Sequence, residues 1–327
     1  MNKYNWGILS TAKIGRRAMI PALKESKFAQ VAAIASRNTE KAKNFAIECN
    51  IPVSYGNYNT LLNDPLIDII YNPLPNHLHK AWTIRAAEAG KHILCEKPLA
   101  LNPEECREMI AAARTNGVQL MESFMYRHHP RIKAAREMIQ NGVIGEVKTI
   151  ESAFTFNLQN ANDFRYNPEM GGGSLMDVGC YCINISRLIT GREPEWVQAR
   201  AVWAPSGVDD QLTAILDFGD GVLAHFDSGF NQSTRQRCIV AGTDGFLVIR
   251  DAFLPGKGKT VIYEVRPGTS RDHKFSGVDE YRLIAEDFMC SLESGIMPYP
   301  PEDAVANMRV IQALLHSARH DGKPVNL

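Results

Sequence analysis

The sequence of 327 residues lacks the features that mark membrane, secreted or nucleic-acid-binding proteins. No apolar stretch reaches the roughly 18 residues that a bilayer-spanning helix needs. Lys and Arg total 36, as do Asp and Glu, and no basic run occurs, so no net field attracts nucleic acid or an anionic membrane. The first residues lead directly into an expected strand without a signal-peptide h-region. These absences favour a cytoplasmic protein that acts on a small molecule.

Disulfide and metal frameworks are also missing. The seven cysteines are odd in number and have no framework spacing, which indicates reduced thiols. Cys180 and Cys182 stand too close together for an ordinary zinc pair, and no matching His/Cys cluster occurs elsewhere. We therefore expect no metal. Repeats, low-complexity segments and flexible linkers are absent, and the length favours two domains.

The first domain, residues 1–122, is predicted to be a doubly wound α/β domain that binds a dinucleotide. Short apolar runs alternate with helical patterns, as in a parallel sheet. The expected strands are 4–9, 30–36, 68–72, 92–95 and 118–121, and the expected helices end near 24 or span 39 onward, 76–89 and 103–116.

The second domain, residues 123–327, is predicted to be α+β with a large, open, mainly antiparallel sheet. Expected strands cover 147–156, 196–203, 211–218, 222–230, 237–241 and 245–250, with hairpin turns at 219–221 and 243–245. Helices are expected at 130–141, from the triple glycine to 190, at 279–294 and at 302–320, where the last helix can pack back on the first domain. Because an open sheet must cover its free face, we expect self-association as a dimer or tetramer.

Two turns of the first domain suit NADP(H). Ser10 and Ala12 replace the first two glycines of a dinucleotide turn, and small residues there let backbone amides approach a pyrophosphate. The strand ending at Ser36 meets Arg37, with Lys41 one helical turn later and no acidic residue to bind a ribose 2′-hydroxyl. This pattern favours a 2′-phosphate, although an exposed loop arginine is the plainer explanation.

Chemistry is expected at two places. Lys97 follows a buried strand in Glu96-Lys97-Pro98, where open α/β sheets bind ligands. Asp177 and Tyr181 follow three glycines and, four residues apart, share one helix face. By itself, Lys97 is equally compatible with a solvated strand end. For Asp177 and Tyr181 taken alone, a surface charge and a core aromatic are the favoured explanations. His79, a lone helical histidine, is more often structural than catalytic.

Together these motifs resemble the glucose–fructose oxidoreductase/inositol dehydrogenase (Gfo/Idh/MocA) family over nearly the whole chain. The resemblance rests on the turn 10–15, Pro75-Asn76-His77-Leu78-His79, residues 90–99 with Glu96-Lys97-Pro98-Leu99, and residues 171–181. Tyr181 stands where many members carry His. That departure, with residues 122–127 and 162–165, is similar to the branch of NADP-dependent D-xylose dehydrogenases and dimeric dihydrodiol dehydrogenases.

The resemblance implies a nicotinamide-dependent oxidoreductase with a lysine, Lys97, at the reacting oxygen and a Lys-Pro bond that is often cis. The expected catalytic residues are Lys97, Tyr181 and Asp177. Cofactor contacts are expected from Ser10, Thr11, Ala12, Ile14, Ser36, Arg37, Lys41, Asn72, Leu74, Pro75, Asn76, His79, Glu96, Lys97, Arg127 and Arg165. Substrate contacts are expected from Lys97, Phe156, Asn162, Arg165, Asp177 and Tyr181.

The expected reaction is hydride transfer between NADP(H), preferred over NAD(H), and a sugar or polyol carbon. Tyr181, its pKa lowered by Lys97, is expected to exchange the hydroxyl proton. Oxidation of an aldopyranose of the D-xylose or D-glucose type comes first, followed by reduction of a keto-sugar or nucleotide-keto-sugar and by oxidation of a trans-dihydrodiol. A regulator that binds NADP without catalysis is the alternative from another class.

Overall fold

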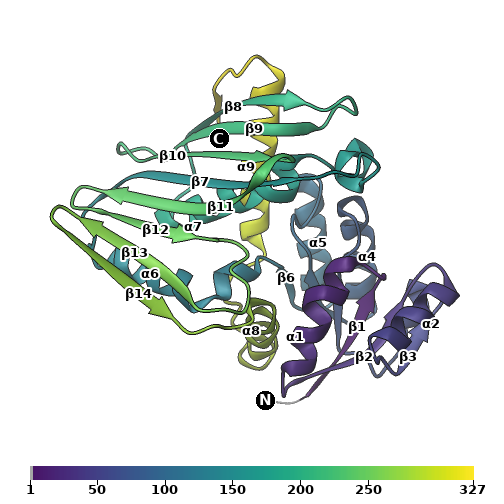
Figure 1. Cartoon of the computed structure of the whole chain (residues 1–327). Coiled ribbons are helices and arrows are strands. Elements are labelled where there is room, and N and C mark those ends of the chain that lie inside the picture. The colour runs from purple at the N-terminus through teal and green to yellow at the C-terminus, as the bar shows by residue number, and fades with distance from the viewer. Residues whose placement is uncertain (1–2) are drawn as a thin grey trace. The chain divides into compact units, whose positions relative to one another are not determined.

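The computed structural model describes residues 3–327, and its contacts divide the chain into two units. The first unit comprises the residues up to Met125 and Asp279–Val305, and the second comprises Tyr126–Val278 and Ala306–Leu327. Figure 1 labels the elements of both units. The sequence interpretation drew one boundary, at residue 122, whereas this division also groups residues 279–305 with the first unit.

The first unit contains a six-stranded sheet in the order β3-β2-β1-β4-β5-β6, and every strand pairing that defines it is parallel. This confirms the expected doubly wound sheet. Its central strands read as continuous apolar runs because both faces are buried, as β4 shows along its whole length. The strands are β1 (Tyr4–Leu9), β2 (Ala29–Ala35), β3 (Val53–Tyr55), β4 (Ile69–Asn72), β5 (His92–Cys95) and β6 (Leu120–Glu122).

Helices connect these strands in sequence. They are η1 (Gly15–Met19), α1 (Ile20–Glu25), α2 (Thr39–Glu48), α3 (Tyr58–Leu62), α4 (Asn76–Glu88) and α5 (Pro103–Thr115), and α8 (Glu280–Ser294) joins them from the later segment. Helix α8 packs against α1, and the ring of Phe288 lies edge-on to Trp6 at 6.3 Å between centroids. The buried apolar face of α8 therefore explains why residues 279–305 group with the first unit.

The second unit contains a nine-stranded sheet in the order β14-β13-β12-β11-β7-β10-β9-β8-β15. The expected hairpins β9–β10 and β11–β12 are confirmed as antiparallel, and one pair, β7–β10, is parallel. The strands are β7 (Val147–Asn157), β8 (Trp196–Trp203), β9 (Asp209–Asp217), β10 (Leu223–Gly229), β11 (Asn231–Gly242), β12 (Phe246–Arg250), β13 (Thr260–Arg266), β14 (Thr269–Phe275) and β15 (Val325–Asn326).

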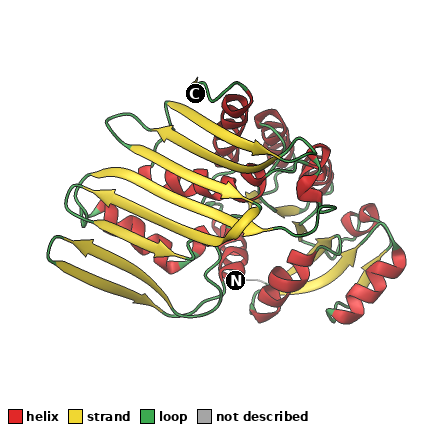
Figure 2. Cartoon of the chain, turned by 45° about the horizontal axis from the view of Figure 1, so that its top comes forward, coloured by secondary structure: helices red, strands yellow, loops and turns green. Residues whose placement is uncertain are grey.

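The helices of this unit lie on one face of its sheet, and Figure 2 shows the strands with these helices behind them. They are α6 (Pro130–Gln140), the continuous pair η5 (Leu175–Gly179) and α7 (Cys180–Thr190), and the second half of α9 (Glu302–Arg319). Short turns η2 (Met125–His128), η3 (Phe164–Tyr166) and η4 (Pro168–Met170) complete the unit. Among the described residues, no helix is long and apolar enough to cross a bilayer.

Candidate active site

The turn after β1 has the backbone shape of a dinucleotide-phosphate turn. Ser10 has a φ of 75°, in the left-handed region that favours glycine, and its N–H donates to the Ala35 carbonyl at 2.9 Å. The small side chains of Thr11 and Ala12 follow, and Ile14 directly precedes the helix that starts at Gly15. These residues leave room for a phosphate near a helix N-terminus, which fits the pyrophosphate of a dinucleotide.

The end of β2 presents two exposed cations. Arg37 and Lys41 are both exposed, while Ser36 is buried and its hydroxyl accepts the Asn38 N–H at 3.3 Å. Burial raises the pKa of the Tyr58 hydroxyl, and the adjacent Arg37 guanidinium opposes that shift. Since residues 36–39 contain no carboxylate, this strand end suits a 2′-phosphate better than a ribose hydroxyl.

The residues after β4 form a buried scaffold. The Asn72 amide donates to the Thr83 hydroxyl at 3.2 Å and accepts the Leu74 N–H at 3.3 Å. His79 is fully buried, with Nδ1 lying 3.0 Å from the Pro98 carbonyl and Nε2 lying 2.6 Å from the Leu74 carbonyl. Both ring nitrogens of His79 therefore engage the backbone, and His79 links this loop to the one that carries Lys97. Pro75 and Asn76, half-buried and buried, begin α4 beside this scaffold.

Lys97 lies in a rigidly held turn after β5. Its bond to Pro98 is cis. Burial raises the pKa of the Glu96 carboxyl, opposed by the Tyr71 hydroxyl, which donates to it at 2.6 Å, and by the Lys97 charge. The Glu122 carboxylate accepts the Leu99 N–H at 2.7 Å. The turn is thus fixed from neighbouring strands, and the Lys97 side chain is half-buried.

In the second unit, Asp177 pairs with Arg165. Arg165 Nε donates to Asp177 Oδ2 at 2.6 Å, and its Nη1 lies 3.2 Å from Asp163 Oδ1. Burial lowers the pKa of Arg165, but the two carboxylates outweigh it and raise that pKa. The guanidinium lies 4.7 Å from the Phe164 ring centroid and 5.9 Å from that of Phe156. The structure therefore brings together charged and aromatic groups that the sequence separates by up to 21 positions.

Asn162, expected at the substrate, is exposed, and its N–H donates to the Asn160 side chain at 3.1 Å.

Tyr181 lies among aromatic rings on α7. Its ring centroid is 5.3 Å from that of Phe154, 5.4 Å from Phe253 and 5.9 Å from Tyr126, and the residue is 4% exposed. The tyrosine therefore packs as a core aromatic, and its ring position is fixed by this packing. Asp177, one helical turn earlier, has a side chain 14% exposed.

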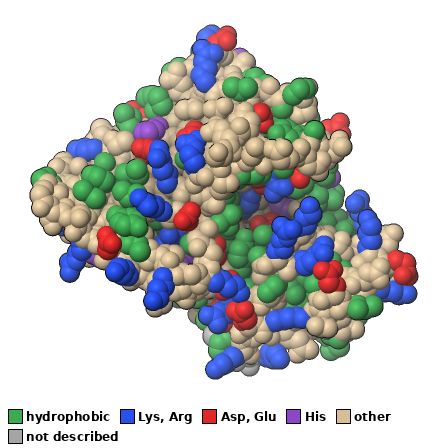
Figure 3. Space-filling model, in the orientation of Figure 1, with side chains coloured by type: hydrophobic (Ala, Val, Ile, Leu, Met, Phe, Trp, Pro, Cys, Tyr) green, Lys and Arg blue, Asp and Glu red, His purple; other side chains and the backbone are tan. Residues whose placement is uncertain are grey.

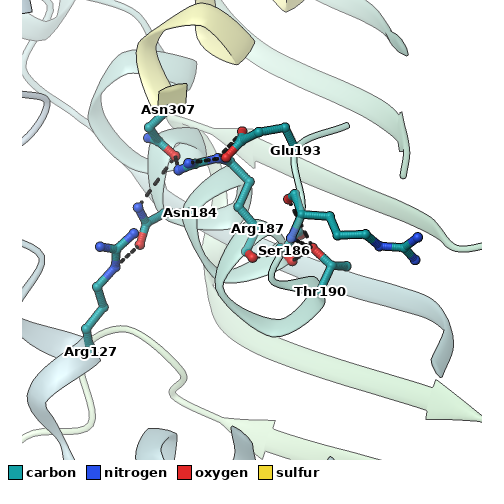
Figure 4. Close-up of polar contacts among 8 residues, drawn as sticks. Arg127, Asn184, Ser186, Arg187, Thr190, Glu193 and Asn307 are labelled. Carbon is teal, nitrogen blue, oxygen red and sulfur yellow. Dashed lines mark hydrogen bonds and ion pairs between the residues drawn. The ribbon is translucent and has the colours of Figure 1, made fainter. Parts of the chain in front are cut away.

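Polar contacts also hold α7 in place, as Figure 4 shows. Arg127 Nε donates to Asn184 Oδ1 at 2.6 Å, and the Asn184 amide lies 3.5 Å from Asn307 Oδ1. Asn307 on α9 also donates to the Cys180 carbonyl at 3.3 Å and accepts from Arg187. Arg127, expected at the cofactor, is buried in this network, where it anchors α7.

Sequence reasoning overlooked two groups beside this site. The Asp210 carboxylate accepts the Tyr166 hydroxyl and the Asn231 amide, each at 3.0 Å. The neighbouring Asp209 binds the start of the helix at Ser174 and Leu175. The only sequence signal for these groups is the adjacent pair Asp209-Asp210 directly before an expected strand. Adjacent acidic residues are common at exposed turns, so this pair does not by itself indicate a site. Within the described residues, no group of three or more His, Cys, Asp or Glu side chains can hold a metal ion.

Comparison with known proteins agrees with this geometry. Residues 4–124 match the sequence model of an oxidoreductase family with an NAD-binding Rossmann fold, and residues 132–248 match that of the GFO/IDH/MocA C-terminal domain. The chain is also 38% identical over 317 residues to a D-xylose 1-dehydrogenase (NADP(+)) of Haloferax volcanii, covering 96% of this chain and 97% of that protein. The chain belongs to the GFO/IDH/MocA oxidoreductase family. The family resemblance and the oxidoreductase class expected from the sequence are confirmed.

Two further relatives show the breadth of the family around this member. A trans-1,2-dihydrobenzene-1,2-diol dehydrogenase of Xenopus laevis is 37% identical over 306 residues, which cover 90% of this chain and 91% of that protein. The crystal structure of a 3-ketoreductase from Actinomadura kijaniata, in complex with NADP and TDP-benzene, has a TM-score of 0.91 and 31% identity, with 96% of this chain and 98% of that chain covered. The GFO/IDH/MocA chain described here is therefore an enzyme with an NAD(P)-binding Rossmann domain.

Proposed function

We propose that this enzyme transfers hydride between NADP(H) and a hydroxyl or carbonyl carbon of a sugar, with an aldopyranose of the D-xylose or D-glucose type as its first substrate class. The observation that carries the proposal is the cluster of Arg165 and Asp177 beside Phe156 and Phe164. Aromatic faces combined with charged hydrogen-bonding groups suit a polyhydroxylated ring. The Haloferax volcanii relative, named as a D-xylose dehydrogenase, supports this order of substrates.

Tyr181 and Lys97 are proposed to manage the proton. A bound nicotinamide supplies or accepts the hydride. The Tyr181 hydroxyl accepts the substrate hydroxyl proton in oxidation and returns it in reduction, while the Lys97 ammonium lowers the pKa of that phenol. The fixed turn around Lys97 and the packed ring of Tyr181 suit groups that must stay in place during proton transfer. Asp177 orients the substrate or tunes this pair through Arg165.

NADP(H) is the proposed cofactor. Arg37 and Lys41 can pair with a 2′-phosphate, and the turn Ser10–Gly15 can receive the pyrophosphate. The acid that would select NAD(H) is absent from the β2 end. A reducing cytoplasm is the proposed place of action, because the seven cysteines have no disulfide-framework spacing in the sequence.

The test is nicotinamide absorbance with NADP and then NAD against D-xylose, D-glucose, myo-inositol and a trans-dihydrodiol. We expect turnover of an aldopyranose with NADP preferred. Turnover of the diol alone would replace the sugar proposal with the activity of the Xenopus laevis relative. No turnover of any of these substrates, with NADPH still bound tightly, would contradict the proposal. That result would favour a nucleotide-keto-sugar substrate or a regulator without catalytic activity.

We further propose that the nine-stranded sheet binds a second copy of this chain through the face opposite its helices. Register places Leu223, Thr149, Ala241, Phe246 and Val265 in one row across five strands, so their side chains share that face. Leu223 is 42% exposed and Phe246 is 37% exposed. Figure 3 shows hydrophobic side chains gathered over β11 to β13. Apolar side chains in such a row indicate a surface that is covered by protein.

Light scattering after size-exclusion chromatography tests the self-association. We expect the wild type to elute as a dimer or larger, and Phe246→Asp with Leu223→Asp to shift it toward the monomer. Lys148→Asp, on an exposed β7 position of the opposite parity, is the control. A monomeric wild type would refute the interface.

A further inference from the structure

The helix that carries Asp177 and Tyr181 begins without a capping side chain of its own. Ser174 stands at the N-cap position with helical φ and ψ of −65° and −34°, and its side chain makes no capping bond to the helix. The first N–H groups of a helix have no partner within it, and burial without an acceptor is costly. An acceptor from elsewhere in the fold is therefore required here.

That acceptor is Asp209, at the start of β9. Asp209 Oδ2 accepts the Leu175 N–H at 2.6 Å and the Ser174 hydroxyl at 2.8 Å. The Ser174 hydroxyl also lies 3.0 Å from that of Ser228 on β10. Asp209 is 2% exposed, and Ser174 and Ser228 are 0% exposed. A carboxylate at a helix N-terminus is favourable both as an acceptor and toward the helix dipole.

An irregularity in the sheet points Asp209 at the helix. Val202 pairs with Gln211 but Trp203 pairs with Asp209, so β9 contains one extra residue at this point. An extra residue reverses the alternation of side chains beyond it. Asp209 consequently lies on the same face as the buried Leu212, which is the helix-bearing face, instead of the open one.

The residue before the helix is shaped around the same carboxylate. Gly173 has a φ of 113°, and a Cβ added there would lie 2.2 Å from Asp209 Oδ1. The Gly173 carbonyl accepts the Asp177 N–H at 3.0 Å, so this segment leads directly into the proposed site. The triple glycine thus provides the close approach that the carboxylate needs.

We propose that Asp209 is a positioning residue that fixes the start of this helix, and through it Asp177 and Tyr181, for the reaction proposed above. The effect on catalysis rests on the proposed function. The role of Asp209 as a helix cap is independent of that function.

The charge state of Asp209 lies within the working range of an enzyme. Burial raises its pKa to about 6, while the bonds from Ser174 and Leu175 and the charge of Arg319 oppose that shift. Arg319 on α9 lies over the ring of Trp203, the register partner of Asp209. The groups facing it from η5 and β10 are neutral serines. Asp209 is therefore mostly ionised at pH 7 and mostly protonated at pH 5. Because its pKa in the folded protein lies above that of an exposed Asp, the closed helix start takes up this proton more readily than an opened one, and lowering the pH from 7 to 5 stabilises it against opening.

The test compares wild type with Asp209→Asn, which keeps the shape and an acceptor oxygen but carries no charge at any pH. Asp217→Asn, the same change at the other end of β9, is the control. Hydrogen exchange of peptides covering residues 174–179 is measured from pH 5 to 8 as protection factors. We expect wild-type protection to rise roughly 10-fold as pH falls from 7 to 5, because the closed state takes up a proton at Asp209, and Asp209→Asn, which has no such proton, to show no pH dependence of this kind.

Turnover supplies the second reading. With the substrate found above, Asp209→Asn is expected to lower kcat roughly 3- to 30-fold, to leave the NADPH affinity within about 2-fold and to remove the change in kcat that accompanies titration of Asp209 near pH 6. Unchanged exchange in Asp209→Asn at every pH would overturn the cap. Altered exchange with an unchanged kcat profile would leave a structural cap only and overturn the positioning role.

If the wild type turns over no panel substrate, the exchange result still decides the cap while the proposed function fails separately. Should Asp209→Asn not fold, Ser174→Ala, which removes one of the two bonds to the carboxylate, is expected to lower the protection of the same segment.

Discussion

Replacing Gly173 by Ala is expected to destabilise the second unit more than the same change at any open glycine. The new Cβ would lie 2.2 Å from Asp209 Oδ1, so the carboxylate must move away from Ser174 and Leu175. A non-glycine residue at a left-handed φ costs about 1–3 kcal/mol, and loss of a helix cap costs about 0.5–2 kcal/mol. Together these terms predict a loss of about 2–5 kcal/mol in the free energy of unfolding.

Gly191→Ala is the matched control, because Gly191 ends the same helix with a φ of 65° and nothing within 4 Å of its Cβ position. It should cost only the left-handed penalty of about 1–2 kcal/mol. Equilibrium urea unfolding at pH 7.5 measures the loss of unfolding free energy in both variants, compared at the same dependence of that free energy on urea concentration. Equal losses in the two variants would refute the reasoning, because the carboxylate would then have moved without cost.

Three further predictions concern the proposed site. Tyr181→Phe should lower kcat roughly 100- to 10,000-fold and leave the affinity for NADPH unchanged. The control Tyr126→Phe, which removes a hydroxyl from the same aromatic cluster, should change kcat far less. Equal kcat in Tyr181→Phe and wild type would show that Tyr181 takes no part in the chemistry. Arg37→Ser should weaken NADPH binding, measured by calorimetry, by about 10-fold or more and leave NADH binding nearly unchanged. The reason is that a charge-assisted bond to phosphate contributes about 1.5–3 kcal/mol. An equal loss of affinity for both cofactors would contradict a contact between Arg37 and the 2′-phosphate. His79 should make the protein acid-sensitive: burial lowers its pKa from 6.5 to about 4, so its contribution, at most about 3 kcal/mol, is present above pH 6.5 and lost as pH falls toward 4. The free energy of urea unfolding should therefore change less between pH 7 and 4.5 in His79→Gln than in wild type. The same pH dependence in both proteins would exclude His79 as a source of the acid sensitivity.

Local patterns predicted much of the fold because burial on both faces of a parallel sheet leaves a direct mark in the sequence. The expected strands at 92–95 and 196–203 match β5 and β8 residue for residue. The two glycine-containing turns also identified their hairpins correctly. In the turn 219–221 all three residues have φ above zero, which favours glycine. The same local patterns single out Lys97 after β5 and the pair Asp177/Tyr181, whose catalytic roles stay predictions.

Other elements carry too weak a pattern to be predicted. Strand β3 has only three residues, and β14 reads Thr-Ser-Arg-Asp-His-Lys-Phe, which is polar because most of this edge strand is exposed. The parallel pairing of β7 with β10 joins segments more than 60 positions apart, and turn residues say nothing about such a pairing. The grouping of α8 with the first unit depends on its buried face, not on a composition change in the chain.

The sequence by itself determined the family and the doubly wound class of the first unit, and it supplied Lys97 and Tyr181 as the residues proposed for the chemistry. Only the tertiary structure decided which groups support them. The Asp209 carboxylate reaches Leu175 across 34 positions because one extra residue in β9 turns its side chain over. Another contact between distant parts of the chain is the hydrogen bond from Arg127 to Asn184, 57 positions later. Such contacts depend on the relative placement of strands and helices, which is set by packing of the whole core and leaves no local periodic signal.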